Sequence, residues 1–289
     1  MQASLLTNLL LPLVLGIIML GLGLGLTLDD FRRVARYPRA VLIGLALQTL
    51  VLPWAAFGLA LGFGLPAELA VGLMLLAASP GGATANIYSH LARGDVALNI
   101  TLTAINSLLC LLTLPVILNL SLEYFLGAGQ YVPPPTKKVI EVAAIILLPV
   151  AIGMVIRARA AGFAACTEKP IRLLSVLVLA LLVVAAVAQE WKTLTTYFAI
   201  VGLACLLFNL ASMGAGYAAP LALRLPKKQA IAIAMEIGIH NGTLAIFIAL
   251  NVLQNATISV PAAVYSLLMF VTAAGFAWWV SRGGREAAG

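Results

Sequence analysis

The sequence predicts an all-α integral membrane protein with about nine transmembrane helices, two of them broken near the middle of the bilayer. The chain is 63% hydrophobic and 9% charged, and its mean hydropathy is +1.09, values that exclude an ordinary soluble core. Long apolar segments alternate with short loops that carry most of the Lys and Arg residues. Helix-breaking residues interrupt two of these segments.

The predicted helices are nine apolar segments: 4–27, 39–63, 67–92, 96–126, 137–158, 171–189, 193–222, 229–253 and 257–281. At ~1.5 Å per residue, each is long enough to cross a hydrocarbon core of ~30 Å. No basic region precedes the first segment, and it is too long for the core of a signal peptide, so we expect it to span the membrane. The sixth segment is the shortest.

The loop charges predict the orientation of these segments. With nine spans and the N-terminus outside, the inner loops and the C-terminus hold all but three of the 17 basic residues. Only Lys137, Lys138 and Lys192 fall outside, which is a strong positive-inside bias. The lack of a transit peptide and of large soluble loops favours a bacterial inner membrane as the location.

Other functional classes are disfavoured. The net charge of +7 comes without a basic patch interleaved with aromatics, so nucleic acid is not an expected partner. Cys110 and Cys205 lie in apolar segments and Cys166 in a polar loop, a pattern without disulfide or metal-ligand spacing. There is no His-Glu-x-x-His motif, no intramembrane aspartate pair and no nucleophile–base motif. We therefore expect neither an enzyme nor a bound cofactor.

The first predicted break lies in the third segment, at Ser79-Pro80-Gly81-Gly82. Pro80 removes a backbone donor and disfavours helix at Ser79, and the two glycines weaken the helix further. The eighth segment has a similar weak point at His240-Asn241-Gly242. By the helical rise, the breaks lie ~15 Å and ~18 Å from the inner end of their segments.

The two broken segments run in opposite directions across the membrane. Segments one to four and segments six to nine are equal in number, and corresponding segments also run in opposite directions. This arrangement predicts an inverted repeat, and paired broken helices are typical of transporter binding sites. The half-helices that begin near Ala83 and Gly242 would direct free N–H groups toward an anionic ligand. The predicted substrate-binding residues are Ala83, Thr84, Asn241 and Gly242.

Glu236 lies in the middle of the apolar stretch 230–253, whereas the other acids fall in loops or near segment ends. A charged residue at this depth costs about 2.5–3.5 kcal/mol on insertion scales, so we expect Glu236 to have a function. It could hold a cation, carry a proton, face a water-filled cavity or serve as a protonated packing group. With Asn86, unwound carbonyls and nearby hydroxyls, it offers hard oxygen ligands that suit Na⁺.

Several other polar residues allow more than one interpretation. His240 follows Glu236 by four residues, and the pair could form a proton relay, a cation site with an accessory imidazole, or a structural hydrogen bond. A polar stripe on the fourth segment could line a site or bind neighbouring helices, as could Gln48. The stripe comprises Asn99, Thr103, Asn106 and Ser107. Asn209 fits a helix–helix contact better.

Taken together, these features resemble the bile acid:sodium symporter family over most of the chain. The resemblance is carried by Gly16–Gly23, Gln48 with Pro53, Ser79–Gly82, Asn86, Leu91–Leu98, and Glu236–Gly238 with Asn241. It implies a panel domain of about 4–27 and 137–189, and a core domain of about 39–126 and 193–281 in which the broken helices cross. It also implies symport of an organic anion with Na⁺.

The resemblance further implies two cation sites. The first would use Asn86, Asn99, Thr103 and Glu236. The second would use Gln48, Glu236 again, and the backbone carbonyls of Ile237 and Ile239, with His240 beside them.

The chain departs from the family pattern in four places. Ala85 replaces a common serine, His240 replaces a frequent glutamine, and Met269-Phe270 replaces a His-Asn pair that some relatives offer to substrate. The extra N-terminal helix of many members is expected to be missing.

The sequence therefore predicts a secondary active transporter that couples Na⁺ to a small organic anion, bile-acid-like or carboxylate, by alternating access. Two alternatives remain open. One is a proton-coupled or sodium-independent anion carrier that uses Glu236 and His240. The other is a membrane protein that binds a ligand without transporting it.

Overall fold

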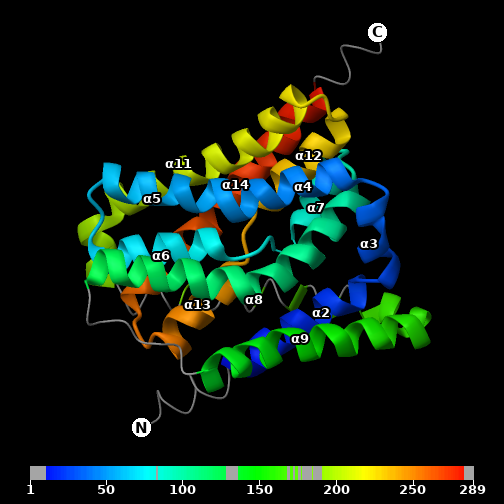
Figure 1. Ribbon diagram of the computed structural model, residues 1–289, viewed down its shortest axis with the longest axis horizontal. Helices are drawn as coiled ribbons and strands as arrows, with labels where there is room; N and C mark the ends of the chain where they lie inside the picture. The colour runs from blue at the N-terminus through cyan, green and yellow to red at the C-terminus, as the bar shows by residue number, and fades with distance from the viewer. Residues whose placement is uncertain are drawn as a thin grey trace.

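The computed structural model describes residues 11–82, 84–127, 136–167 and 191–282, together with residues 170, 171, 173, 174, 177 and 184 (Figure 1). Within these ranges every regular element is a helix, and a single bridge pairs Gly81 with His240. The elements are α2 (Leu11–Gly25), α3 (Leu28–Arg32), η2 (Arg33–Ala35), α4 (Pro38–Ala46), η3 (Leu47–Val51), α5 (Leu52–Gly62), α6 (Ala67–Ala78), α7 (Ala85–Leu91), α8 (Val96–Leu126), α9 (Thr136–Arg159), α11 (Trp191–Ala222), α12 (Lys227–Gly238), α13 (Gly242–Phe247), η4 (Ile248–Val252), η5 (Thr257–Ser259) and α14 (Val260–Arg282).

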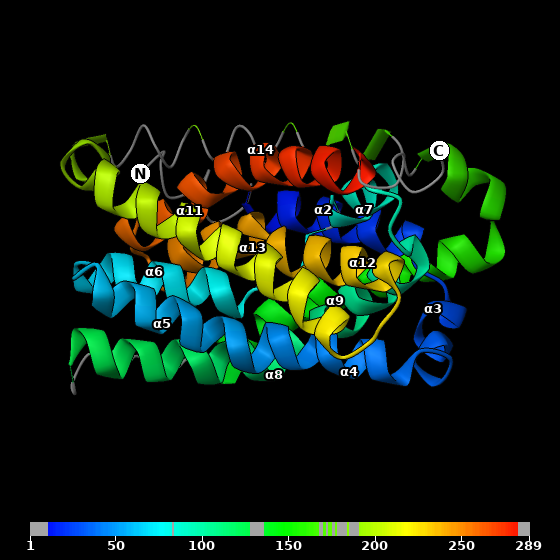
Figure 2. The ribbon, with the colours of Figure 1, turned by 90° about the horizontal axis from the view of Figure 1, so that it is seen from above.

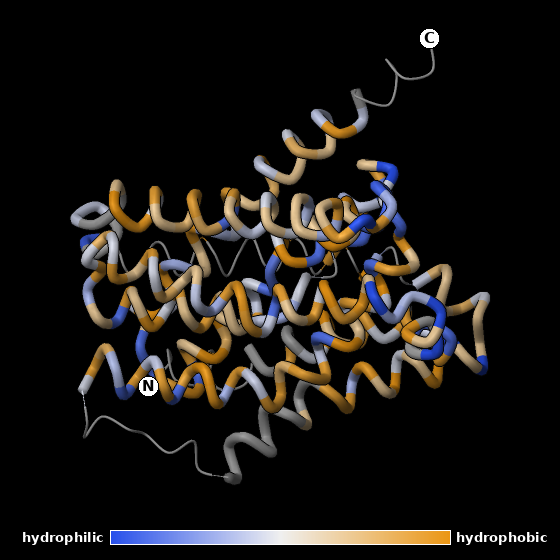
Figure 3. Tube along the Cα trace, turned by 45° about the horizontal axis from the view of Figure 1, so that its top comes forward, coloured by the Kyte–Doolittle hydropathy of each residue, from blue (hydrophilic) through white to orange (hydrophobic). Residues whose placement is uncertain are grey.

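Four continuous stretches of the described residues are long and apolar enough to cross a membrane: 38–62, 96–126, 199–222 and 257–281. The helices run roughly along one direction (Figure 2), and hydrophilic residues gather mainly near their ends (Figure 3). Large apolar side chains such as Leu112 and Val271 are exposed, as expected for a surface that faces lipid. The chain is thus a multi-pass α-helical membrane protein.

The helices match the predicted segments closely where the structure describes them. The fourth segment, 96–126, coincides with α8, and α9 covers the fifth. The second segment is less regular than predicted, because it contains the π-helical turn η3, which includes Gln48 and ends two residues before Pro53. Most of the sixth segment, 171–189, lies outside the described residues.

Both predicted helix breaks are present, and the two breaks meet. Helix α6 ends at Ala78 and α7 begins at Ala85, whereas α12 ends at Gly238 and α13 begins at Gly242. The Gly82 N–H donates to the Ile239 carbonyl at 2.7 Å, and the Asn241 N–H donates to the Pro80 carbonyl at 2.8 Å. Each break therefore satisfies backbone groups that the other exposes, which makes unwound chain tolerable inside an apolar bundle.

The segments around the two breaks share local structure at positions 160 residues apart. Helices α6 and α12 both have 12 residues and both follow a Leu-Pro pair, with Ala67 corresponding to Lys227. The residues before those pairs, Gly64 and Arg224, both have positive φ, 57° and 62°. Further along, the Asp95 side chain caps Leu98 as the Asn255 side chain caps Ile258. The two stretches of chain thus build the same succession of turns and helices.

Helices α2 and α9 form a tightly packed pair along one face of the molecule, with α4 and α5 on the opposite side (Figure 1). Two glycines allow this approach. A Cβ on Gly153 would lie 2.6 Å from the Leu20 carbonyl oxygen, and a Cβ on Gly23 would meet the backbone of Val150. Small residues of this kind let helix backbones come close in membranes.

Candidate functional site

Glu236 lies at the junction of α12 with α8 and is completely buried. The Thr103 hydroxyl donates to its Oε2 at 2.5 Å, and the Asn106 amide donates to its Oε1 at 3.1 Å. Both donors come from one face of α8, because positions 103 and 106 are three residues apart. The carboxylate is thereby held at a fixed place beside the helix break.

Gly81 forms one wall of the space around this carboxylate. A Cβ placed on Gly81 would collide with Oε1, Cδ and Oε2 of Glu236. The backbone of the first break therefore lies directly against the acid that precedes the second. Only glycine leaves room for the carboxylate in this position.

Amide oxygens without hydrogen-bond partners lie on α7 and α8, the helices that pack against α12 at this junction. The Asn99 amide nitrogen donates to the Ala232 carbonyl at 2.8 Å, and the Asn106 amide nitrogen donates to Glu236. The oxygen of each side chain therefore points away from the acceptor of that hydrogen bond. The oxygens of Asn86, Asn99 and Asn106 are buried and accept no hydrogen bond. Buried acceptors of this kind are costly unless a ligand or water meets them. Together with a carboxylate and a hydroxyl, they are the ligand types that hard cations prefer.

Gln48 approaches the first break from the π-helical turn η3. Its amide donates to the Ser79 carbonyl at 2.9 Å and to the Ala77 carbonyl at 3.2 Å. These bonds stabilise the C-terminal end of α6, whose last carbonyls have no helical partner. The Oε1 atom of Gln48 remains buried without a partner.

His240 is buried on another side of the break. Its ring stacks on Phe208 with centroids 5.6 Å apart and meets the Tyr265 ring at 5.4 Å. Its Nδ1 lies 3.2 Å from the Ser79 carbonyl oxygen. Because α12 ends at Gly238, His240 does not lie on the same helix face as Glu236. The His240 ring packs against α11 and α14, whereas the Glu236 carboxylate accepts hydrogen bonds from α8.

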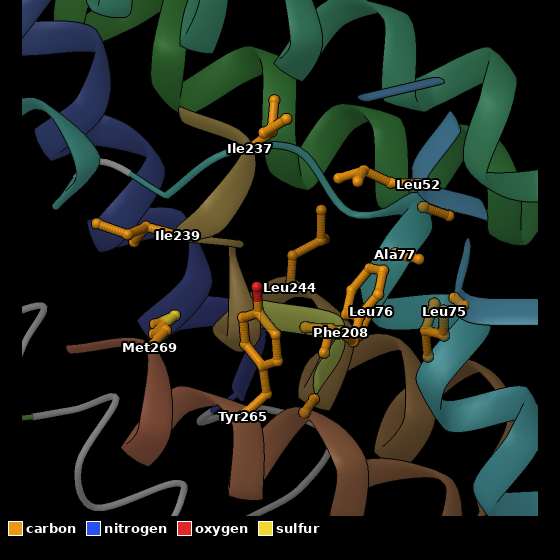
Figure 4. Packing of buried hydrophobic residues seen from close by; sticks show 14 of the residues in the cluster. Leu52, Leu75, Leu76, Ala77, Phe208, Ile237, Ile239, Leu244, Tyr265 and Met269 are labelled. Atoms are coloured by element: carbon orange, nitrogen blue, oxygen red, sulfur yellow. The ribbon is translucent and has the colours of Figure 1, made fainter. Parts of the chain in front are cut away.

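The end of α12 is fixed by two side chains from other helices. Asn209 on α11 and Tyr265 on α14 both donate to the Gly238 carbonyl at 2.8 Å. Phe208, Tyr265, Ile239 and Leu244 pack around this point in the buried core (Figure 4). The break is therefore held by specific contacts from neighbouring helices.

A cavity of about 380 Å³ lies between the two breaks and α2. Three of the predicted substrate residues line it, namely Thr84, Asn241 and Gly242, and the fourth, Ala83, lies outside the described residues. The side chain of Asn241 also caps α13, since its Oδ1 accepts from the Leu244 N–H at 3.1 Å. Helix α7 begins at Ala85 with Thr84 before it, two residues later than expected.

The remaining walls of the cavity are mostly apolar, with Ile18, Met19 and Leu22 of α2 facing the breaks and Met269 beside them. Among the residues that the structure describes, no Lys or Arg lines it. The cavity extends to His90, which is exposed, and to Leu26 at the loop that leads into α3. This is the end of the molecule where the basic loops lie.

Among the predicted cation-binding residues, Thr103 forms a hydrogen bond with Glu236, and Asn99 lies one helical turn from Thr103 on α8. Two contributors were not predicted as site residues. Asn106 belongs to the predicted polar stripe, and its helical spacing from Thr103 is the signal that could have identified it. Gly81 was predicted only as a helix breaker, and nothing local in the sequence indicates its contact with Glu236.

Comparison with known proteins identifies relatives. Residues 12–197 match the family model described as the sodium bile acid symporter family. The chain is 31% identical to an uncharacterized sodium-dependent transporter, YocS, of Bacillus subtilis strain 168, over 89% of this chain and 78% of that protein.

Eukaryotic proteins are similar too. A probable chloroplastic sodium/metabolite cotransporter of rice, BASS2, is 29% identical over 93% of this chain, which spans 63% of that protein's length. The ileal sodium/bile acid cotransporter of rabbit is 28% identical over half of this chain.

Proposed function

This chain belongs to the sodium bile acid symporter family, and on that premise we propose that it is a secondary active transporter that couples Na⁺ to a small organic anion. The family and its relatives are transporters, not enzymes. The observation that carries the proposal is the buried Glu236 carboxylate, held between two meeting helix breaks and accompanied by amide oxygens that accept no hydrogen bond. A carboxylate at membrane depth among unpaired oxygens suits a cation that enters and leaves.

In the proposed cycle Na⁺ binds beside Glu236, Thr103 and Asn99, close to the backbone of both breaks. The hydrogen bonds between Gly82 and Ile239, and between Asn241 and Pro80, couple one break to the other. A cation that orders one break therefore also orders the other. The ordered residues Ala83, Thr84, Asn241 and Gly242 would then complete a site for the anionic group of the substrate in the cavity.

The body of the substrate would lie against the apolar wall of α2, with Met269 on its other side. The lining favours an anion whose charge meets backbone and hydroxyl groups and whose remaining surface is apolar. The panel would comprise about 4–27 and 137–189 and the core about 39–126 and 193–281, moving against each other in alternating access. Because the cavity reaches the end with the basic loops, we assign this conformation to an inward-facing state.

The shared turns 160 residues apart support an inverted repeat in this core. We propose nine spans with the N-terminus outside and the C-terminus inside. Exposed aromatic side chains near helix ends support this placement: Tyr124 lies near the end of α8, and Trp278 and Trp279 lie near the end of α14.

A proton relay between Glu236 and His240 receives less support, because the helix ends between them and their side chains bond to different elements. The test below separates this alternative from sodium coupling.

The test is thermal unfolding of the purified protein in NaCl against choline chloride at matched ionic strength and fixed pH. A ligand at 100 times its Kd stabilises the folded state by about 2.7 kcal/mol, so Na⁺ should raise the melting temperature in a saturable way. Glu236→Gln should remove this rise and the Na⁺ stimulation of uptake while the protein remains folded. Glu123→Gln, which neutralises an exposed acid on α8, is the matched control.

Full Na⁺ stabilisation of Glu236→Gln would overturn the assignment. If the melting temperature of the wild-type protein does not change with Na⁺ but does change with pH near neutrality, the result would point to proton coupling instead. A ligand that binds tightly but never accumulates in liposomes would indicate a binding protein without transport.

A further inference from the structure

We propose that this chain binds a single Na⁺, on the α8 side of Glu236, and that the imidazole of His240 prevents a second cation from binding beyond the break. This inference rests on the proposed sodium coupling and concerns its stoichiometry.

The α8 side of Glu236 is rich in oxygen. Asn86, Asn99 and Asn106 each have a buried amide oxygen without a partner, and Thr103 touches the carboxylate through its hydroxyl. The Asn99 nitrogen is bonded to the Ala232 carbonyl, whereas Asn106 faces Glu236 with its nitrogen and so turns its oxygen away from the carboxylate. The oxygens of Asn86 on α7 and Asn99 on α8, with the carboxylate and the Thr103 hydroxyl, are therefore the ligand types for a hard cation on this side.

The side toward His240 offers fewer oxygens. A carbonyl oxygen can only accept a hydrogen bond, so the His240 Nδ1 that faces Ser79 at 3.2 Å must carry a proton. The Nε2 atom is then a nitrogen lone pair, buried and without a partner. Imidazole nitrogen suits transition metals, whereas Na⁺ prefers oxygen. Stacking on Phe208 and contact with Tyr265 hold the ring in this orientation.

The other groups on that side are engaged in holding the breaks together. The Ile239 carbonyl accepts from the Gly82 N–H at 2.7 Å, and the Ser79 carbonyl is approached by both Gln48 and His240. Gln48 Oε1 and Asn209 Oδ1 are the buried side-chain oxygens left without a partner there, and Asn209 already holds the Gly238 carbonyl through its nitrogen. A nitrogen lone pair, two amide oxygens from separate helices and partly used carbonyls make a poorer Na⁺ site than a carboxylate bonded to a hydroxyl on the α8 side.

In the substrate-free protein, the buried charge favours the same number of bound cations. Glu236 is the only acid near the middle of the broken helices, so one Na⁺ neutralises it completely. A second Na⁺ would be an uncompensated buried charge until an anion arrived, and uncompensated buried charges are strongly unfavourable. Symport of one Na⁺ with one monovalent anion then moves no net charge across the membrane.

The experiment is equilibrium binding of radioactive Na⁺ to the purified full-length protein in detergent. The expected result is one Na⁺ bound per wild-type chain, and His240→Gln, which restores a side-chain oxygen, should bind a second. Asn86→Ala should abolish binding in the wild-type background but leave one bound Na⁺ in the His240→Gln background. Melting temperatures in choline report whether each variant is folded.

The outcomes separate the two proposals. Two Na⁺ bound per wild-type chain would overturn the single-cation inference and leave sodium coupling standing. No bound Na⁺ would overturn sodium coupling itself. If His240→Gln folds but still binds one Na⁺, then His240 is not what excludes the second cation. If that variant does not fold, the wild-type stoichiometry still decides the inference.

Discussion

At the scale of single residues, the site depends on one carboxylate and on what lies within contact distance of it. Glu236 accepts hydrogen bonds from Thr103 and Asn106 and faces the bare Cα of Gly81. A hydrogen bond to a charged group is worth about 1.5–3 kcal/mol, so each of these neighbours affects the carboxylate substantially.

Gly81→Ala should displace the Glu236 carboxylate, because the added methyl group would occupy its position. We expect the variant to fold and to lose Na⁺-dependent stabilisation, measured as the melting temperature in NaCl against choline. Gly202→Ala is the matched control, since a Cβ there meets nothing within 4 Å. An unchanged response to Na⁺ in Gly81→Ala would contradict the site geometry.

Thr103→Val removes the hydroxyl bonded to Glu236 while keeping the shape of the side chain. Losing a charge-assisted hydrogen bond of about 1.5–3 kcal/mol corresponds to an increase of roughly tenfold or more in the Na⁺ concentration at half-saturation. Thr113→Val is the control, because Thr113 is on the same helix and its hydroxyl donates to the Leu109 carbonyl of its own helix. Equal Na⁺ affinities in the two variants would remove Thr103 from the site.

At the scale of elements, the broken helices are stable because each break is built against the other and against intact helices. Backbone hydrogen bonds join Gly82 to Ile239 and Asn241 to Pro80, while Gln48 and Asn209 donate to the carbonyls at the ends of α6 and α12. Outside the breaks, α2 and α9 pack through glycine contacts. Helix pairs of this kind have little tolerance for added side-chain volume.

Gly153→Val should weaken the packing of α2 against α9, because its side chain would collide with the backbone of α2. Overpacking of this kind costs about 1–3 kcal/mol, which should lower the melting temperature in detergent. Gly162→Val, at a position with open space around it, should cost less. If Gly153→Val had the same melting temperature as the wild type, then moving α2 away from α9 would not cost stability, which would contradict this packing argument.

At the scale of the whole molecule, the basic residues and the cavity support the proposed orientation across the membrane. The cavity extends to His90 and Leu26, at the end where the loops carry most of the Arg and Lys residues. Positive residues mark the inner side of membrane proteins. The proposed orientation therefore places the cavity entrance on the cytoplasmic side.

Cys166 offers a direct test of this orientation, because it is exposed whereas Cys110 and Cys205 are buried. A membrane-impermeant maleimide should label Cys166 in inside-out vesicles and not in intact cells. In a Cys166→Ser background, Lys192→Cys should show the opposite pattern, because Lys192 is exposed in a predicted outer loop. Labelling of both positions from the same side would rule out the nine-span topology.

The sequence by itself determined much about this protein. Hydropathy located the spans that the structure describes, Pro80 and the glycines located the breaks, and an acid in an apolar stretch made Glu236 a candidate functional residue. These features are local consequences of backbone chemistry and of solvation cost, so they can be read along the chain. The inverted repeat, the two-domain division and the N-out orientation remain predictions that the sequence supports.

Only the tertiary structure decided which groups meet. Glu236 and His240 are four residues apart, yet the break between them directs one toward α8 and the other toward Phe208 and Tyr265. Gly81 and Glu236 are distant in sequence and come into contact because the two breaks pair. Helical spacing predicts neighbours only while the helix continues, and contacts between distant segments depend on how the whole bundle packs.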